Sequence, residues 1–270
     1  MKIEHFPFSP RTWRLCDVRV GTRALADVGR FEIGSSLNSM TIRAITFDLD
    51  GTLWDAEPAL LQAERAVHDW LEAHHRPLTD VYSIADLRAL RQQLAEDFPE
   101  LRHDVTALRK AAFKVAAERV GIDPKVSEQA FRVFMQYRNR VHVYNDVLPV
   151  LARLRERYIL CSLTNGNADL RVIGMDHFFH YSLSAVDAGV AKPQPEIFAK
   201  LCALAGAVPE ETVHVGDEAD TDVAGAAASG CRTVWINRRG TRWQHAWRPD
   251  AEIGSLDELE GLLATWDGHG

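Results

Sequence analysis

The sequence predicts an α/β fold, a doubly wound (Rossmann-like) parallel sheet with a four-helix domain inserted after its first strand. Three observations support this prediction. From residue 42 onward, short apolar runs alternate with amphipathic helical patterns. The stretch 56–145 interrupts the alternation, because it shows helical periodicity and no convincing strand. Polar side chains follow the apolar runs, at the edge where open parallel sheets bind ligands.

Five apolar runs are predicted as strands. They are "IRAITF" (42–47), "YILCSL" (158–163), "YSLS" (181–184), "TVHV" (212–215) and "RTVWI" (232–236). Helical patterns at 147–157, 195–206 and 220–229 separate the later runs. Strands joined by right-handed helical crossovers run parallel, so their carboxyl ends meet at one edge of the sheet.

The stretch 56–145 predicts four helices, each with apolar side chains at helical spacing. Breaks are expected at "HHRPLTD", "FPE" and "GIDPK". His103 and Asp104 are candidates to cap the third helix, while Arg138 and Arg140 are expected in solvent or paired with carboxylates of the insert. The four apolar faces are Leu60, Ala63, Val67 and Leu71; Ile84, Leu87, Leu94 and Phe98; Val105, Leu108, Ala112 and Val115; and Val126, Ala130, Phe134 and Tyr137.

The domain boundaries follow from these patterns. We predict a core at 41–55 and 146–270 and the helical insert at 56–145. Asp146 is the expected N-cap where the chain re-enters the core, and Ser255 with Glu258 forms an expected capping box before a terminal helix. Residues 1–40 are either an extension that packs on the core or an addition upstream of a start at Met40, and we favour the second.

Composition excludes several function classes. The 270 residues carry a net charge of -7, whereas nucleic-acid binding usually needs a basic surface. No apolar run approaches the roughly 20 residues of a membrane span, and no signal peptide is evident. We therefore expect a cytoplasmic protein with a small-molecule partner, either monomer or homodimer. A zinc site or disulfide framework is not expected from four cysteines that lie far apart, at Cys16, Cys161, Cys202 and Cys231.

Four groups of reactive side chains lie at predicted strand ends or in the loops after them. Asp48 and Asp50 follow the first strand, Thr164 follows the second, Lys192 lies in a later loop, and Asp217 follows "TVHV". Each group alone is also typical of an ordinary turn. Together they match one chemistry, because carboxylates hold Mg2+ while a hydroxyl, N–H groups and an ammonium surround phosphate. One aspartate then remains free to act as a nucleophile.

Four segments resemble, in order and spacing, the motifs of the haloacid dehalogenase (HAD) superfamily. The resemblance extends from about Ile42 to Trp243, and the helical insert resembles the C1 cap of that superfamily. It implies a Mg2+-dependent phosphotransfer enzyme, most often a phosphatase. The four segments are "DLDGTLWD", "LTNGN", "KPQPEIF" and "VGDEADTDVAGAAASG".

The resemblance also implies roles for the two aspartates of the first motif. Asp48 would be the nucleophile and a metal ligand. Asp50 would protonate the leaving oxygen, then deprotonate the hydrolytic water, and would offer its backbone carbonyl to Mg2+. Dehalogenases of the superfamily lack the second aspartate and need no metal, so Asp50 favours a phosphatase.

The remaining motifs imply the phosphate and metal contacts. Thr164, with the backbone of Asn165, would bind the phosphoryl oxygens, and Lys192 would neutralise both the phosphate and the nucleophile. Asp217 would ligate the metal, and Asp222 would orient Lys192 or a metal-bound water.

Three features of the insert and its flanks go beyond the generic motifs: Trp54 with Asp55, "RHDVTALR" (102–109) and "QYRNRV" (136–141). Together with "TNGN", they resemble a bacterial branch that acts on flavin mononucleotide and on 5-amino-6-(5-phosphoribitylamino)uracil. Trp54 could stack on a flat ring or merely pack the hinge. His103 and Arg109 could reach the polar edge or ribityl chain of such a substrate. A sugar phosphate or nucleotide phosphatase, a phosphomutase and a non-catalytic phosphate-binding module remain alternatives.

Overall fold

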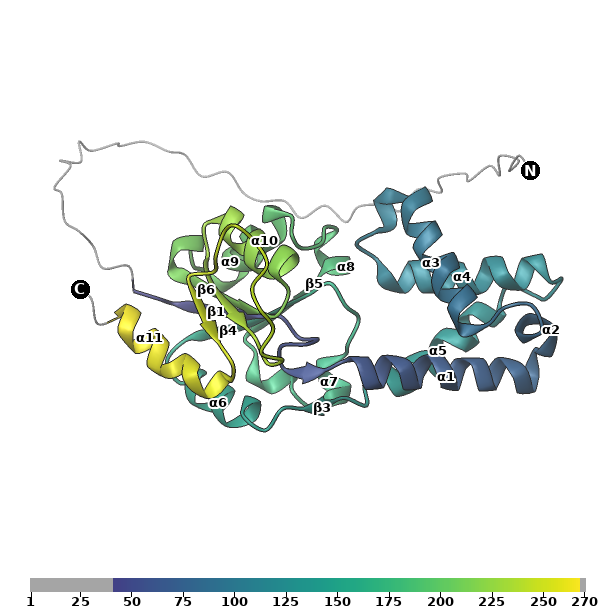
Figure 1. The fold of residues 1–270 in the computed structure, drawn as a ribbon, viewed down its shortest axis with the longest axis horizontal. Helices are drawn as coiled ribbons and strands as arrows, with labels where there is room; N and C mark the ends of the chain where they lie inside the picture. Colours follow the sequence, from purple (N-terminus) through teal and green to yellow (C-terminus); the bar gives the residue numbers. More distant parts are fainter. Residues whose placement is uncertain (1–40, 268–270) are drawn as a thin grey trace, which may run out of the picture. The chain divides into compact units, whose positions relative to one another are not determined.

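A computed structural model of the chain describes residues 41–267, and it contains one six-stranded sheet in which all neighbouring strands pair in parallel. The strand order is β5-β4-β1-β6-β7-β8. The order reverses direction at β1, as in a doubly wound fold, and the predicted fold class is confirmed (Figure 1). The strands are β1 (Ala44–Phe47), β4 (Ile159–Thr164), β5 (Tyr181–Ser184), β6 (Thr212–Gly216), β7 (Arg232–Ile236) and β8 (Ala251–Ile253).

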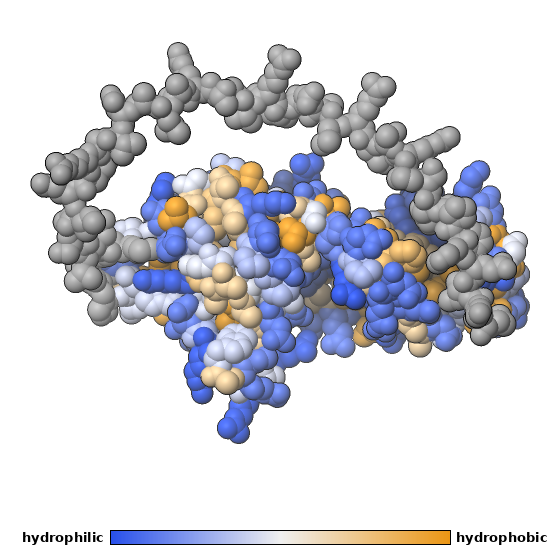
Figure 2. All heavy atoms as spheres, turned by 90° about the horizontal axis from the view of Figure 1, so that it is seen from above, coloured by the Kyte–Doolittle hydropathy of each residue, from blue (hydrophilic) through white to orange (hydrophobic). Residues whose placement is uncertain are grey.

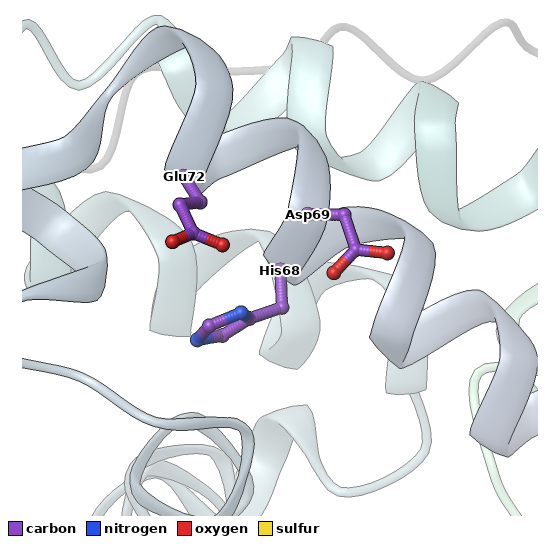
Figure 3. Close-up of side chains that lie close together, drawn as sticks. All are labelled: His68, Asp69 and Glu72. Carbon is purple, nitrogen blue, oxygen red and sulfur yellow. The ribbon is translucent and has the colours of Figure 1, made fainter.

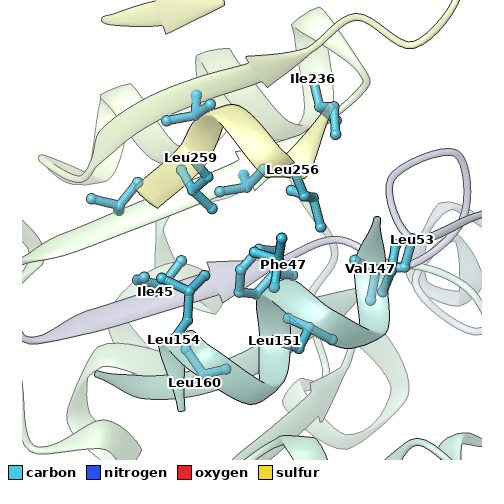
Figure 4. Packing of buried hydrophobic residues seen from close by; sticks show 14 of the residues in the cluster. Ile45, Phe47, Leu53, Val147, Leu151, Leu154, Leu160, Ile236, Leu256 and Leu259 are labelled. Atoms are coloured by element: carbon cyan, nitrogen blue, oxygen red, sulfur yellow. The ribbon is translucent and has the colours of Figure 1, made fainter. Parts of the chain in front are cut away.

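Alternating side chains of the strands fill an apolar cluster on each face of the sheet. Ile45 and Phe47 point into the cluster with α6 (Val147–Leu154) and α11 (Leu259–Asp267), as Figure 4 shows. Ala44 points into the other cluster, with α9 (Pro195–Ala205) and α10 (Ala224–Ser229). The shorter elements of the core are α7 (Leu170–Ile173), η2 (Asp176–Phe178), α8 (Ala185–Ala188), η3 (Pro209–Glu211), η4 (Ala219–Val223) and η5 (Leu256–Glu258).

The helical insert has an apolar cluster of its own. Side chains such as Ala63, Leu71, Ala116 and Phe134 are fully buried there. The four predicted helices are present, and the short helix α2 lies within the expected break "HHRPLTD". Phe98 does not belong to the second helical face, since it follows the last residue of α3 and is 40% exposed. The elements are α1 (Glu57–His74), α2 (Arg76–Thr79), α3 (Ile84–Asp97), η1 (Pro99–Leu101), α4 (Val105–Arg119) and α5 (Val126–Arg138).

Two strand pairings were not predicted. β8 has three residues, too few for a recognisable alternation. A two-residue antiparallel ribbon joins β2 (Trp54–Asp55) to β3 (His142–Val143), where the chain enters and leaves the insert. The prediction that 56–145 contains no strand is therefore wrong for β3, because its two residues pair with partners 87 and 89 positions away in the chain.

The predicted cap residues lie at helix starts in the structure. Ser255 and Glu258 form the expected capping box, and Asp104 accepts the Ala107 N–H at 2.8 Å to cap α4. Asp146 occupies the predicted N-cap position of α6, but its side chain makes no cap hydrogen bond. Its carboxylate instead accepts the Leu256 N–H at 2.7 Å.

Polar side chains cover most of the face shown in Figure 2, with apolar side chains in small patches between them. No helix within residues 41–267 is long and apolar enough to cross a membrane. The expected N-terminal extension and the alternative start at Met40 lie outside the described residues.

Candidate active site

The neighbouring strands β4, β1 and β6 bring the predicted site residues to one edge of the sheet. Thr164 is the last residue of β4, Asp48 follows β1, and Asp217 follows β6. Lys192 reaches the same place from the loop between α8 and α9 and contacts Asp48. Parallel pairing therefore assembles residues that are up to 169 positions apart in the chain, from Asp48 to Asp217.

Lys192 lies between two buried carboxylates. Its Nζ donates to Asp48 Oδ1 and to Asp222 Oδ1, each at 2.5 Å. All three side chains are less than a tenth exposed. Burial alone disfavours the ammonium, but Asp222 and Asp48 outweigh it and raise the pKa of Lys192 above its ordinary value. Lys192 is therefore a fixed positive charge beside the candidate nucleophile.

Asp48, Asp217 and Asp222 form a group of three carboxylates, and one oxygen atom from each lies within 4.8 Å of the other two. Burial raises the pKa of Asp48 well above its ordinary value, and Asp222 and Asp217 raise it further. Burial and Asp222 likewise raise the pKa of Asp217 to about 7. Three carboxylates face one ammonium, so the group has an excess of negative charge. A hard divalent cation with oxygen ligands fits this donor set.

Gly51 and Thr52 shape the approach to Asp217. Gly51 has a φ of 84°, and a Cβ atom there would lie 2.2 Å from Asp217 Oδ2. The Thr52 hydroxyl donates to Asp217 Oδ1 at 3.2 Å. Only glycine lets the turn after Asp50 pass this close to the carboxylate.

The predicted phosphate-binding residues lie beside this carboxylate group. The buried Thr164 hydroxyl accepts the Gly166 N–H at 2.9 Å. The Asn165 side chain accepts the Lys192 N–H at 2.9 Å and donates to the Lys192 carbonyl at 3.0 Å. The side chain of Asn165 therefore holds the loop that carries Lys192, a use that the sequence did not indicate.

Asp50 is held from two directions. Its Oδ1 accepts the Trp54 Nε1–H at 2.8 Å, and its Oδ2 accepts an N–H of Arg138 Nη2 at 2.5 Å. A Cβ atom on Gly166 would lie 2.8 Å from Asp50 Oδ2 and 3.2 Å from Thr164 Oγ1. The candidate acid–base residue and the phosphate-binding hydroxyl thus both approach Gly166 so closely that a larger residue there would clash with them.

The structure corrects the predictions for Trp54 and Arg138 and leaves the prediction for His103 open. Trp54 is 0% exposed, so it presents no face to a substrate and instead packs the hinge and holds Asp50. Arg138 is neither in solvent nor paired with a carboxylate of the insert, because it is 1% exposed and bound to Asp50 of the core. Arg140 is exposed, as expected. His103 has no hydrogen-bond or ion-pair partner within residues 41–267, and its role stays a prediction.

Arg109 lies inside the insert and does not join the carboxylate group. Its guanidinium stacks 3.8 Å from the centre of the Phe134 ring, and its Nη1 lies 3.6 Å from Glu64 Oε1. Burial and the neighbouring Arg91 lower its pKa to about 9. In this arrangement Arg109 packs the insert, and its contact with a substrate stays a prediction.

His214 is a residue of the site that sequence reasoning missed. Its Nδ1 lies 2.7 Å from Thr46 Oγ1, and its Nε2 lies 3.2 Å from Asp222 Oδ1. Although burial works the other way, Lys192 and His214 hold the pKa of Asp222 below its ordinary value. The available signal was a histidine in the otherwise apolar run "TVHV".

A cleft of about 630 Å3 opens beside Thr164 and is lined by residues of the core and of the insert. Thr106 at the start of α4 accepts a hydrogen bond from Asn167 Nδ2 at 3.1 Å, which joins the two sides. Gly166, Asn167 and Ser184 also line it. Such a volume accommodates a small organic ligand next to Thr164.

A second group of possible metal ligands lies on α1, where His68, Asp69 and Glu72 come close together (Figure 3). His68 and Glu72 are one helical turn apart and share a face of α1. Asp69 and Glu72 are exposed, and nothing around them distinguishes the group from an ordinary solvated helix surface. We assign it no role.

Known proteins are similar to this chain in sequence and in fold. A 5-amino-6-(5-phospho-D-ribitylamino)uracil phosphatase (YigB) of Escherichia coli strain K12 is 31% identical over 230 residues, which are 82% of this chain and 96% of that protein. The crystal structure of a 2-haloacid dehalogenase from Pseudomonas syringae pv. tomato is 37% identical, with a TM-score of 0.79, and the match covers 84% of this chain and all of that one.

A more distant structure has the same fold. A HAD phosphatase from Thermococcus onnurineus is 28% identical, with a TM-score of 0.61, over 82% of this chain and 98% of that one. The model of the haloacid dehalogenase-like hydrolases matches residues 42–230, which include every site residue described above. The chain therefore belongs to the haloacid dehalogenase-like hydrolase family.

Proposed function

We propose that this protein is a Mg2+-dependent phosphatase that hydrolyses a small-molecule phosphate monoester through an aspartyl-phosphate on Asp48. One observation carries the proposal. The Lys192 ammonium is fixed against the buried Asp48 carboxylate, with the Thr164 hydroxyl and Asp50 beside it. A nucleophile, an acid–base group and donors for phosphoryl oxygens thus occupy one place. Neither a nucleic acid nor a membrane is needed as a partner.

The donor set suits the metal. The carboxylates of Asp48 and Asp217 and the backbone carbonyl of Asp50 would hold it, since hard cations prefer oxygen ligands. When bound, Mg2+ supplies the positive charge that three carboxylates and an anionic substrate lack beside a single ammonium.

The chemistry then follows from the positions of the side chains. A carboxylate oxygen of Asp48 attacks phosphorus, and the bond from phosphorus to the ester oxygen breaks. Asp50 gives its proton to the departing oxygen, then takes one from the water that cleaves the aspartyl-phosphate. Lys192, the Thr164 hydroxyl and backbone N–H groups stabilise the charge on the phosphoryl oxygens.

For the substrate, we propose 5-amino-6-(5-phosphoribitylamino)uracil or flavin mononucleotide. The E. coli relative named as a phosphatase of the former compound supports this assignment, because the match covers 96% of its length. Thr106, Asn167 and Ser184 line the cleft with hydroxyl and amide groups, which suit the hydroxyl groups of a ribityl chain. Any stacking on the flat ring would need a residue other than Trp54, which is fully buried.

A dehalogenase is the competing candidate, since the P. syringae structure of that name is 37% identical. Asp50 argues against it. Dehalogenases of the superfamily are expected to lack this second aspartate, whereas here Asp50 is present and oriented by two donors beside Thr164.

Release of inorganic phosphate tests the reaction. The wild-type protein should release phosphate from p-nitrophenyl phosphate with Mg2+ and should stop when the metal is chelated. Asp48→Asn should lower kcat at least a thousandfold, on the order of the loss of a nucleophile elsewhere. Asp69→Asn, an exposed change on α1, is the matched control and should keep normal turnover.

A substrate panel then separates the candidates. Flavin mononucleotide, the ribitylamino-uracil phosphate, sugar phosphates and nucleotides are compared by kcat/KM, and the two ribityl phosphates should rank first. Equal rates across the panel contradict the substrate assignment alone. Release of chloride from 2-chloropropionate without metal, together with no release of phosphate, contradicts the phosphatase itself.

A further inference from the structure

Arg138 belongs to the insert, but its side chain reaches into the core. It is the last residue of α5, and only 1% of its surface is exposed. Its Nη2 donates to Asp50 Oδ2 at 2.5 Å, and its Nε donates to Asn167 Oδ1 at 3.3 Å. The guanidinium therefore lies between the loop after β1 and the loop after β4.

The same guanidinium has a donor without an acceptor. Arg138 Nη1 is buried and has no hydrogen-bond partner, a condition that only one other side-chain atom within residues 41–267 shares. A buried N–H group costs free energy unless an acceptor meets it, so most such groups in folded proteins are paired. A missing acceptor next to catalytic groups points to a ligand.

The position of the guanidinium identifies the kind of ligand. A Cβ atom on Gly166 would lie 2.8 Å from Asp50 Oδ2, 3.2 Å from Thr164 Oγ1 and 3.3 Å from Arg138 Nη2. The guanidinium, the Asp50 carboxylate and the phosphate-binding hydroxyl thus gather around Gly166. Thr164, Gly166 and Asn167 also line the cleft, so the guanidinium lies next to its wall. Arginine presents paired donors that match phosphate oxygens.

We infer that Arg138 is a substrate-binding residue supplied by the insert, whose Nη1 donates to an oxygen of the phosphate ester while Nη2 holds Asp50. This inference rests on the proposed phosphatase function. Nη1 is enclosed in the present arrangement, so the ester reaches it when α5 moves away from the core. Return of α5 then brings the guanidinium to the ester while it still holds Asp50.

Arg140 provides a matched control. It is two residues further along the chain, has the same charge and is exposed, and its Nε donates to the carbonyl of Gln136 at 3.1 Å. The variants R138M and R140M therefore remove the same charge from the same end of α5, but only R138M removes it from the site.

The test measures turnover and phosphate binding together. R138M should lower kcat/KM about a hundredfold, the usual scale for one lost donor to developing charge. Inhibition by inorganic phosphate should weaken at least tenfold. R140M should stay within twofold of wild type in both measurements. Free guanidinium should raise the turnover of R138A at least tenfold. Thermal melting should show that each variant is folded.

Two results would overturn the inference. One is a folded R138M with wild-type kcat/KM. The other is a loss of turnover in R138M with unchanged phosphate inhibition and no recovery by guanidinium in R138A, since Arg138 would then only fasten the insert to the core. Calorimetric binding of inorganic phosphate to wild type, R138M and R140M tests Arg138 without turnover. Absence of phosphate release in the wild type therefore contradicts only the proposed function.

Discussion

At the scale of single residues, Asp50 is oriented by side chains from two parts of the chain. Trp54 comes from the hinge strand β2 and donates to Oδ1, while Arg138 comes from α5 and donates to Oδ2. Trp54 is also fully buried, so its ring fixes the direction of its N–H group. Its place beside Asp50 therefore serves the proposed acid–base step rather than recognition of a flat substrate.

Removal of the Trp54 N–H donor should slow the chemical step. In Trp54→Phe the ring still packs but Asp50 loses one of its two orienting hydrogen bonds, so kcat should fall about tenfold with KM unchanged. Steady-state kinetics with p-nitrophenyl phosphate checks the result. Trp70→Phe, on the half-buried surface of α1, is the control. A rise in KM with unchanged kcat would show that Trp54 acts in binding instead.

At the scale of elements, Asp146 joins three segments of the core. It precedes α6, and its carboxylate accepts hydrogen bonds from the Leu256 N–H, the Ser255 hydroxyl and Arg238 Nη1. Burial raises its pKa, but these three donors outweigh it, and the pKa lies below its ordinary value. The carboxylate thus fastens α6 to the start of the C-terminal helix and to the loop after β7.

The variant Asp146→Asn should lower the free energy of unfolding by about 2 kcal/mol at pH 7, the scale of hydrogen bonds to a charged group. Because the folded pKa is depressed, the contribution is present above the unfolded pKa of about 3.9 and is lost as the pH falls through the folded pKa. Urea unfolding at pH 7 and at pH 3.5 checks this. The deficit relative to wild type should shrink at the lower pH, whereas Asp69→Asn should show no deficit at either.

The ribbon of β2 and β3 is the other element that matters for function. Trp54 pairs with Val143, and Asp55 pairs with His142, so the two connections of the insert run side by side. Motion of the insert would pass through these four residues and the turns next to them. We expect hinges near 55–58 and 143–146, which begin at the last residue of each ribbon strand, and their role in closure stays a prediction.

At the scale of the whole molecule, His214 links the centre of the sheet to the site. It lies on β6, contacts Thr46 of β1 and Asp222, and packs edge-on against Phe198 of α9. Burial lowers its pKa, although Asp222 opposes the shift. Protonation of His214 in the folded protein therefore costs free energy.

Acid should destabilise the protein through this residue. The unfolded chain binds a proton at His214 below a pKa of about 6.5 and the folded chain resists it, so stability present above that pH is lost as the pH falls. The loss from His214 between pH 7.5 and pH 5.5 is up to about 1.4 kcal/mol. Urea unfolding should show a smaller loss in His214→Gln than in wild type. An equal loss in both would contradict the argument, and His68→Gln is the control.

The sequence by itself determined the parallel sheet, most strand bounds, the four main helices of the insert and the positions of Asp48, Thr164, Lys192 and Asp217 at strand ends or in loops. These features depend on local periodicity and on residues next to each apolar run, which a linear pattern contains. The resemblance in motif order then indicated the family, which the comparisons confirm.

Only the tertiary structure decided which side chains complete the site. Arg138 meets Asp50 from 88 positions away, and Asp146 accepts the Leu256 N–H from 110 positions away. The burial of Trp54 and the place of His214 beneath Asp222 also depend on packing between distant segments. An arginine near a helix end has the same local pattern whether it faces water or a carboxylate. The two cases differ only in which distant segment of the chain packs against the arginine.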